Sequence, residues 1–134
     1  MASALLVLIV MAGCGDDDGG SIASLAGTSW SLAEGAGITI PDGVTMTIAF
    51  EDGRTSGAGG CNRFTGSYEE EGDSISFGAL ATTRMACREE VMNAENAYLA
   101  ALDSASTWSA TEDELVLSDG SGEELLRHTA ARHP

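Results

Sequence analysis

Residues 44–53 read Val-Thr-Met-Thr-Ile-Ala-Phe-Glu-Asp-Gly, and this stretch indicates the fold class of the whole chain. From Val44 to Phe50 every second residue is apolar, which is the pattern of a strand that buries one face. Asp52-Gly53 follows, a dipeptide suited to a tight hairpin because both central residues of that turn need positive φ. The stretch therefore predicts a strand, a turn and a returning strand over 54–57.

Similar hairpin signals continue on both sides of this stretch. Two more hairpins are predicted, one pairing 64–69 with 74–77 around a turn at 71–73, the other pairing 115–118 with 123–128 around 119–122. Short strands near 28–32 and 107–111 carry the only two tryptophans, Trp30 and Trp108. These are the largest side chains available to anchor a core in a chain with few aromatic residues.

One segment has a different period. Residues 88–104 contain no Gly or Pro, and Val91, Ala94, Tyr98 and Leu102 recur at helical spacing. The sequence therefore predicts a mainly β (α+β) domain, in which one amphipathic helix is inserted late into an antiparallel, hairpin-built sheet.

Length and charge limit the classes of function. The 134 residues suffice for one domain of ordinary size. Six basic residues against 21 acidic ones give a net charge of -15, which excludes nucleic-acid binding and electrostatic docking on an anionic membrane. Leu, Ile, Val and Phe make up 26 of the 134 residues, so the core is thin and needs further support. The acidic residues cluster at predicted turns, where they stay solvated and protect strand edges from pairing.

The amino terminus has the layout of an export signal. An apolar run from Ala4 to Ala12 ends at Met11-Ala-Gly-Cys14, which resembles a bacterial lipobox. The expected organisation is a lipoprotein signal peptide over 1–13, a lipidated Cys14 with a flexible acidic tether over 14–24, and a domain over 25–130. The protein is then exported and anchored through Cys14 in the bacterial cell envelope, on the periplasmic face of the outer membrane or at the cell surface. An ordinary signal peptide or a buried apolar strand is the alternative interpretation.

The two other cysteines, Cys61 and Cys87, are expected to form a disulfide, since two cysteines in an exported domain most simply pair. Such a bond closes a loop of 27 residues and adds about 3.5 kcal/mol by the chain-entropy model. A reactive thiol is the alternative, but neither cysteine has a CxxC partner or a neighbouring histidine to lower its pKa.

Residues for catalysis or metal binding are scarce. His128 and His133 both lie near the carboxyl end, and the chain has no lysine. We therefore expect no enzyme activity, no metal site and no cofactor. Met46, Met85 and Met92 offer soft-metal ligands, but core packing is the expected use of each.

Several motifs resemble the META/HslJ domain family. Residues 25–32 are similar to its opening motif, 50–68 to its central Gly-Cys-Asn signature, 82–87 to its Met-Ala-Cys motif and 95–102 to its helix. The residues that carry the resemblance are Gly27, Thr28, Trp30, Gly60, Cys61, Asn62, Gly66, Tyr68, Met85, Ala86 and Cys87.

The resemblance implies a small antiparallel, partly open β-barrel or strongly curved sheet of about seven to eight strands, closed by one α-helix. Members of this family are often exported or lipid-anchored, some are heat-inducible or linked to antibiotic tolerance, and no catalytic residues are known to carry over from them. In the signature, glycines permit positive φ or a bulge beside Cys61, and Asn62 is expected to cap local backbone groups. Anion binding by the backbone amides of this run is a weaker alternative.

These features favour a noncatalytic envelope lipoprotein that acts as a binding or stress-response module. Its acidic surface suits a basic protein or envelope component, and inhibition of a basic wall hydrolase such as lysozyme is a specific variant. The alternative is a small apolar-ligand carrier, with Trp30, Tyr98 and Trp108 lining a pocket inside the barrel. A hydrolase built on a carboxylate pair is a third, weaker hypothesis.

Overall fold

The fold was analysed in a computed structural model that describes residues 21–131. The predicted signal peptide, Cys14, most of the predicted tether and His133 lie outside the described residues. The elements in chain order are β1 (Thr28–Gly35), β2 (Thr47–Glu51), β3 (Arg54–Ala58), β4 (Arg63–Glu71), β5 (Ser74–Phe77), β6 (Ala81–Thr82), α1 (Glu89–Ser104), β7 (Thr107–Ala110), β8 (Glu114–Ser118) and β9 (Glu124–Ala130).

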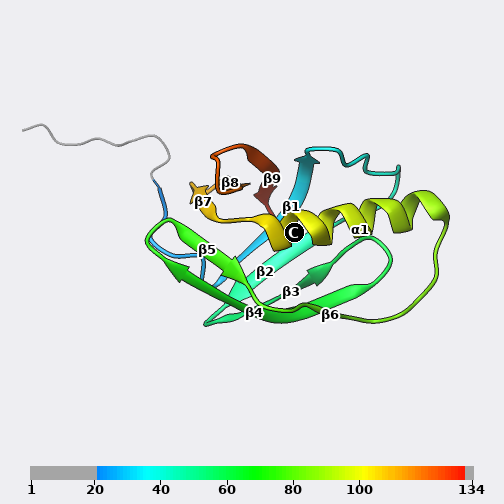
Figure 1. Cartoon of the computed structure of the whole chain (residues 1–134), viewed down its shortest axis with the longest axis horizontal. Coiled ribbons are helices and arrows are strands. Elements are labelled where there is room, and N and C mark those ends of the chain that lie inside the picture. Colours follow the sequence, from blue (N-terminus) through cyan, green and yellow to red (C-terminus); the bar gives the residue numbers. More distant parts are fainter. Residues whose placement is uncertain (1–20, 132–134) are drawn as a thin grey trace, which may run out of the picture.

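The strands form a closed antiparallel barrel. Hydrogen-bonded pairing runs β1–β2–β3–β4–β5–β7–β8–β9 and returns to β1, so the ring has no free edge, while β6 adds to one side of β4 (Figure 1). Because closure removes unpaired edges, this architecture protects a small sheet from pairing with other chains. The predicted mainly β barrel with one helix is confirmed, and the ring of pairings is complete.

Two predicted turns lie where the dipeptide signals put them. Gly53, between β2 and β3, has φ of 79°, and Gly72, between β4 and β5, has φ of 60°. These left-handed conformations are the reason that glycine suits both turns. The junction between β5 and β7 is the shortest in the ring, with Ser74 opposite Thr107 as its only residue pair.

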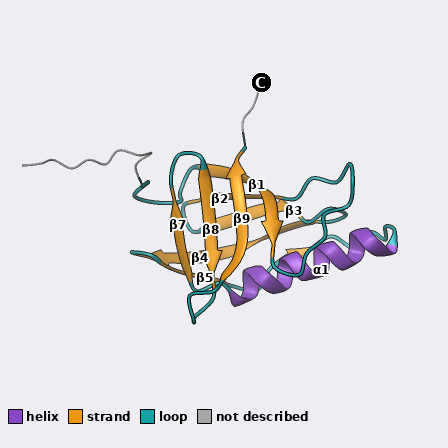
Figure 2. Cartoon of the chain, turned by 90° about the horizontal axis from the view of Figure 1, so that it is seen from above, coloured by secondary structure: helices purple, strands orange, loops and turns teal. Residues whose placement is uncertain are grey.

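Helix α1 lies across one end of the barrel, outside the sheet (Figure 2). It turns Val91, Ala94, Tyr98 and Leu102 into the core, as their spacing predicts, together with Glu95. The core also buries Trp30, Trp108 and the inward side chains of the strands. Within residues 21–131, no helix has the length and apolar character needed to cross a membrane.

Candidate functional site

A buried carboxylate fastens the helix to the signature loop. The side chain of Glu95 is 3% exposed, and its Oε1 accepts hydrogen bonds from the backbone N–H groups of Cys61 (3.0 Å) and Asn62 (2.6 Å). Its Oε2 accepts a third from Asn62 Nδ2 at 2.8 Å. The backbone amides directly after the glycine-rich run therefore bind a carboxyl side chain, and that side chain is Glu95 of the same chain.

The glycines before Cys61 make room for this contact. A Cβ at Gly59 would lie 2.8 Å from Cγ of Glu95, so a larger residue would displace the carboxylate. Gly60 has φ of 114°, a conformation that side chains with a Cβ rarely adopt. The predicted positive φ beside Cys61 is present at Gly60, whereas Gly59 allows the close approach of Glu95, which was not predicted.

Asn62 connects the same cluster to the loop before the helix. Its Oδ1 accepts hydrogen bonds from Met85 N (2.6 Å) and Thr83 Oγ1 (2.8 Å), and its Nδ2 donates to Met85 O (3.3 Å) as well as to Glu95. The expected capping of backbone groups by Asn62 is thus present. We call Glu95, Asn62 and the groups they bind at Cys61, Thr83 and Met85 the polar cluster.

The cluster and a disulfide together hold the 83–88 loop. Cys61 and Cys87 are bonded, with Cα atoms 6.0 Å apart, so the structure contains the predicted disulfide. Met85 is 55% exposed, so the expectation that its side chain packs in the core is wrong. Asn62 binds the backbone of Met85 at the surface and leaves the side chain in solvent. Met46 is buried as expected, and Met92 is half-buried.

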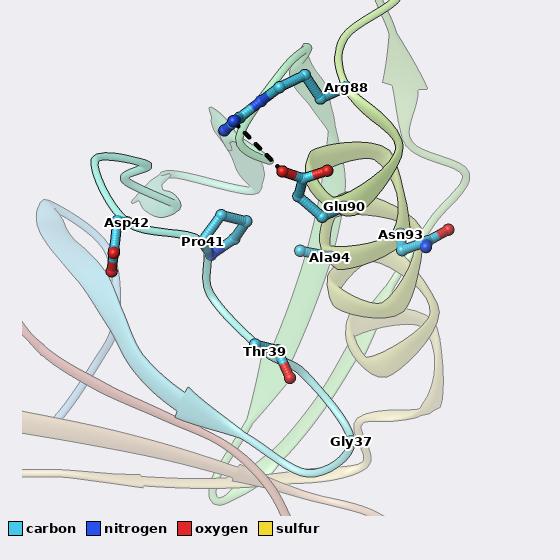
Figure 3. A pocket seen from close by; sticks show the side chains of 8 residues that line it. All are labelled: Gly37, Thr39, Pro41, Asp42, Arg88, Glu90, Asn93 and Ala94. Carbon is cyan, nitrogen blue, oxygen red and sulfur yellow. Dashed lines mark ion pairs between the residues drawn. The ribbon is translucent and has the colours of Figure 1, made fainter.

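A cleft of about 520 Å³ opens beside the start of helix α1 (Figure 3). One wall is the loop between β1 and β2, and the other is the first two turns of the helix with Arg88. Its lining residues are Gly37, Thr39, Pro41, Asp42, Arg88, Glu90, Asn93 and Ala94.

The charges in this cleft are mostly negative. Arg88 is paired with Glu90 at 3.3 Å, and both side chains are well exposed. Asp42 comes from the opposite wall and forms no ion pair with another described residue. With the hydroxyl of Thr39 and the amide of Asn93 nearby, the cleft suits a cationic group that also forms hydrogen bonds.

The three aromatic residues proposed for an interior pocket lie in the hydrophobic core. Trp30 Nε1 donates to Thr28 Oγ1 (2.8 Å), Trp108 Nε1 donates to Gly72 O (3.0 Å), and Tyr98 is fully buried. Trp30 and Trp108 each border a separate surface depression, and the structure does not bring the three rings around one hollow. Their role is to pack the barrel, with both indole N–H groups satisfied locally.

His128 is a buried residue that the sequence analysis missed. It lies fully inside the barrel on β9, where its Nε2 is 3.0 Å from the hydroxyl of Tyr98. Burial lowers the pKa of His128 to about 4 and raises that of Tyr98 well above its usual value. Its period-two spacing from Leu126 could have placed it on the inner face of the strand.

Metal binding has no visible basis in the described part of the chain, because residues 21–131 contain no group of three His, Cys, Asp or Glu side chains arranged for an ion. Two buried side chains could in principle serve as an acid or a base. His128 is enclosed by the core, and Glu95 accepts hydrogen bonds from three donors.

These features define a class of small closed antiparallel barrels, in which one helix seals an end and anchors a Gly-Gly-Cys-Asn loop. A family model described as META domain matches residues 23–132, and the chain belongs to the META domain family. No curated protein matches the chain significantly.

Two solved structures share this fold. An NMR structure of a protein from Burkholderia xenovorans is 25% identical, covers 93% of this chain and 100% of its own, and superposes with a TM-score of 0.70. A crystal structure of a DUF4847 family protein from Bacteroides vulgatus is 14% identical, with a TM-score of 0.59 over 82% of this chain and 96% of its own. The second likeness shows the fold alone.

Proposed function

We propose that this META-domain protein is a noncatalytic lipoprotein of the bacterial cell envelope that binds a basic protein or envelope component. The observation that carries the proposal is the cleft beside helix α1, where Asp42 lines the wall opposite the Arg88–Glu90 pair. A cationic side chain of the partner would interact with Asp42 and Glu90, since carboxylates form the stronger, charge-assisted hydrogen bonds with such groups.

The overall charge supports the same class of partner. A net charge of -15 steers basic molecules toward the protein, and the effect weakens as salt screens it. A basic wall hydrolase such as lysozyme is a specific candidate. If it is the partner, the purified protein inhibits lysis of cell walls at low salt and loses this effect at high salt.

The packed interior of the barrel favours a binding site on the surface. Trp30, Tyr98 and Trp108 pack together with the rest of the core, so they offer weaker support for an apolar-ligand carrier. The exposed cleft is instead accessible to a macromolecule.

Crosslinking in intact cells tests this proposal. A photoreactive residue at Asn93, which lines the cleft, is expected to capture a basic partner, whereas one at Ser121 in the exposed β8–β9 turn is the control. Asp42→Asn should lower the yield at Asn93 several-fold, because it removes the unpaired carboxylate. Equal adducts from both positions, or an unchanged yield with Asp42→Asn, would contradict the proposal.

The anchor is tested separately by Cys14→Ser. We expect this variant to leave the membrane fraction and to lack the mass of an attached lipid. If it still partitions with membranes, the lipoprotein part of the proposal is wrong, while the binding part is judged by the crosslinks alone. A rise in transcript on heat shock would support the stress-response role.

A further inference from the structure

Three arginines form a basic surface on this acidic protein. Of the five arginines within residues 21–131, Arg88 and Arg127 form ion pairs with glutamates. Arg54, Arg63 and Arg84 form none with the described residues, and all three are exposed. In a chain with 21 acidic residues, arginines without carboxylate partners are charges left available to a ligand.

The topology brings these arginines to one side of the barrel. Arg54 is on β3 and Arg63 is on β4, its antiparallel neighbour, so the two side chains flank the Ser56–Thr65 pair. Arg84 follows Thr83, which exchanges two hydrogen bonds with the backbone of Arg63, each 3.1 Å long. The basic surface therefore runs from β3 across β4 to the 83–88 loop.

This surface is hollowed between the arginines. Three depressions, of about 420, 260 and 240 Å³, share Ser56 as a common lining residue. Arg63 borders the first and third, and Arg54 borders the second. Glu51 is the only acidic residue among their lining residues, and it forms no ion pair with Arg54.

The chemistry of the lining identifies a kind of ligand. The hydroxyl groups of Ser56 and Thr65 lie between Arg54 and Arg63, and that of Thr47 borders the third depression. Arg54 Nη2 donates one hydrogen bond to Thr65 Oγ1 at 3.3 Å. A guanidinium has five N–H donors, so most of those on Arg54 stay free for an anion. Carboxylates match the guanidinium fork, and hydroxyls match the hydroxyls of a sugar ring.

We propose that the β3–β4 face, with Arg54 and Arg63 on either side of Ser56, binds an anionic glycan that carries carboxylate groups. Screening at physiological salt limits the reach of exposed charges to about 8 Å, so the opposing charges are those close to this face, such as Glu51, which is the register partner of Arg54 on β2. This site is separate from the cleft at helix α1, and the two can be tested independently.

The test uses the full chain carrying Cys14→Ser and a trimer of galacturonic acid, followed by NMR chemical shifts. Binding is expected to move the backbone signals of Ser56, Arg63 and Thr65, and the uncharged trimer maltotriose is expected to move none of them. The double variant Arg54→Gln/Arg63→Gln should weaken binding about tenfold, through loss of two charge-assisted contacts. Glu51→Gln should tighten it, because it removes the neighbouring negative charge.

Arg127→Gln is the matched control, since Arg127 is occupied by Glu114 and Glu124 on the other side of the barrel. It should leave the affinity for the charged trimer unchanged. Unchanged binding by the double variant would overturn the proposal, as would equal binding of maltotriose. Inorganic phosphate alone giving the same shifts at the same concentration would overturn the assignment of a glycan.

Discussion

Helix α1 buries two polar side chains one turn apart, and their surroundings differ. Glu95 accepts three hydrogen bonds, all from donors in the Cys61–Asn62 loop. The hydroxyl of Tyr98 lies 3.3 Å from Thr47 O and 3.0 Å from His128 Nε2, and the imidazole also contacts the backbone of Leu115. One region holds a carboxylate among three donors, and the other encloses an imidazole in the hydrophobic core.

The difference shows what each buried group contributes. Every hydrogen bond of Glu95 connects elements distant in sequence, so the polar cluster specifies where the helix sits on the barrel. The Tyr98–His128 pair encloses a histidine whose burial favours its neutral form. The first region should therefore dominate stability, and the second should make stability depend on pH.

Replacing the buried carboxylate should have the largest effect. Glu95→Ala leaves the backbone N–H groups of Cys61 and Asn62 without an acceptor and removes one of the two acceptors of Asn62 Nδ2, which costs about 4 kcal/mol in the free energy of unfolding. Urea denaturation measures it.

The matched control for this change is Glu90→Gln, on the exposed part of the same helix. We expect it to alter stability by less than about 0.5 kcal/mol. If both variants lose the same small amount, the polar cluster does not hold the helix, and the comparison between the two regions fails.

Reducing the disulfide should have the next largest effect. Without the Cys61–Cys87 bond, the unfolded chain regains the freedom of the closed loop, at a cost of about 3.5 kcal/mol in stability. The measurement is the urea midpoint with and without reductant. A Cys61→Ala/Cys87→Ala variant should match the reduced protein, and equal midpoints in all three samples would contradict the expectation.

Acid should destabilise the barrel through His128. Burial lowers the pKa of His128 to about 4 in the folded protein, below the ordinary histidine value of 6.5, so the unfolded chain takes up a proton first as pH falls. The stability that comes from keeping His128 neutral is fully present above about pH 6.5. It is lost progressively as pH falls from 6.5 to 4, and the total loss is about 3 kcal/mol.

The histidine term is isolated by comparing unfolding free energies of the parent chain and His128→Gln across that pH range. The carboxylates titrate in both proteins, so their effects cancel in the difference. The variant should show a flatter decline between pH 6.5 and 4. Parallel curves would mean that His128 is not held in its neutral form.

Removing the tyrosine hydroxyl should have the smallest effect of the four. Tyr98→Phe keeps the ring packed against Phe64 and removes the contacts to Thr47 and His128, at a cost of about 1 kcal/mol. A double-mutant cycle with His128→Gln measures the coupling between the two side chains. Additive losses would show that the hydroxyl and the imidazole are energetically independent.

The regular parts of the fold could be predicted from local patterns. Alternation over 44–50 and the Asp52-Gly53 turn gave a hairpin that the structure contains as β2 and β3. Helix α1 begins at Glu89, one residue after the predicted start, and ends at Ser104 as expected. Short-range rules sufficed because turn geometry and side-chain period are set by neighbouring residues.

The ring closure and the polar cluster could not be predicted in the same way. Pairing of β5 with β7 joins segments separated by the whole helix, and β6 is only two residues long. Glu95 did leave one signal, because it falls on the same helical face as Val91, Tyr98 and Leu102. An acidic residue on an apolar face indicates a buried partner, but its donors, Cys61 and Asn62, are more than 30 residues away.

Residues 81–90 are all exposed, so this segment is accessible to proteases. A protease that cuts after Arg84 would separate the barrel strands β1–β6 from the helix and β7–β9 along the chain. The Cys61–Cys87 bond spans that point, so the two fragments would stay covalently joined until reduced. Nicked molecules would migrate as one species on a non-reducing gel and as two on a reducing gel.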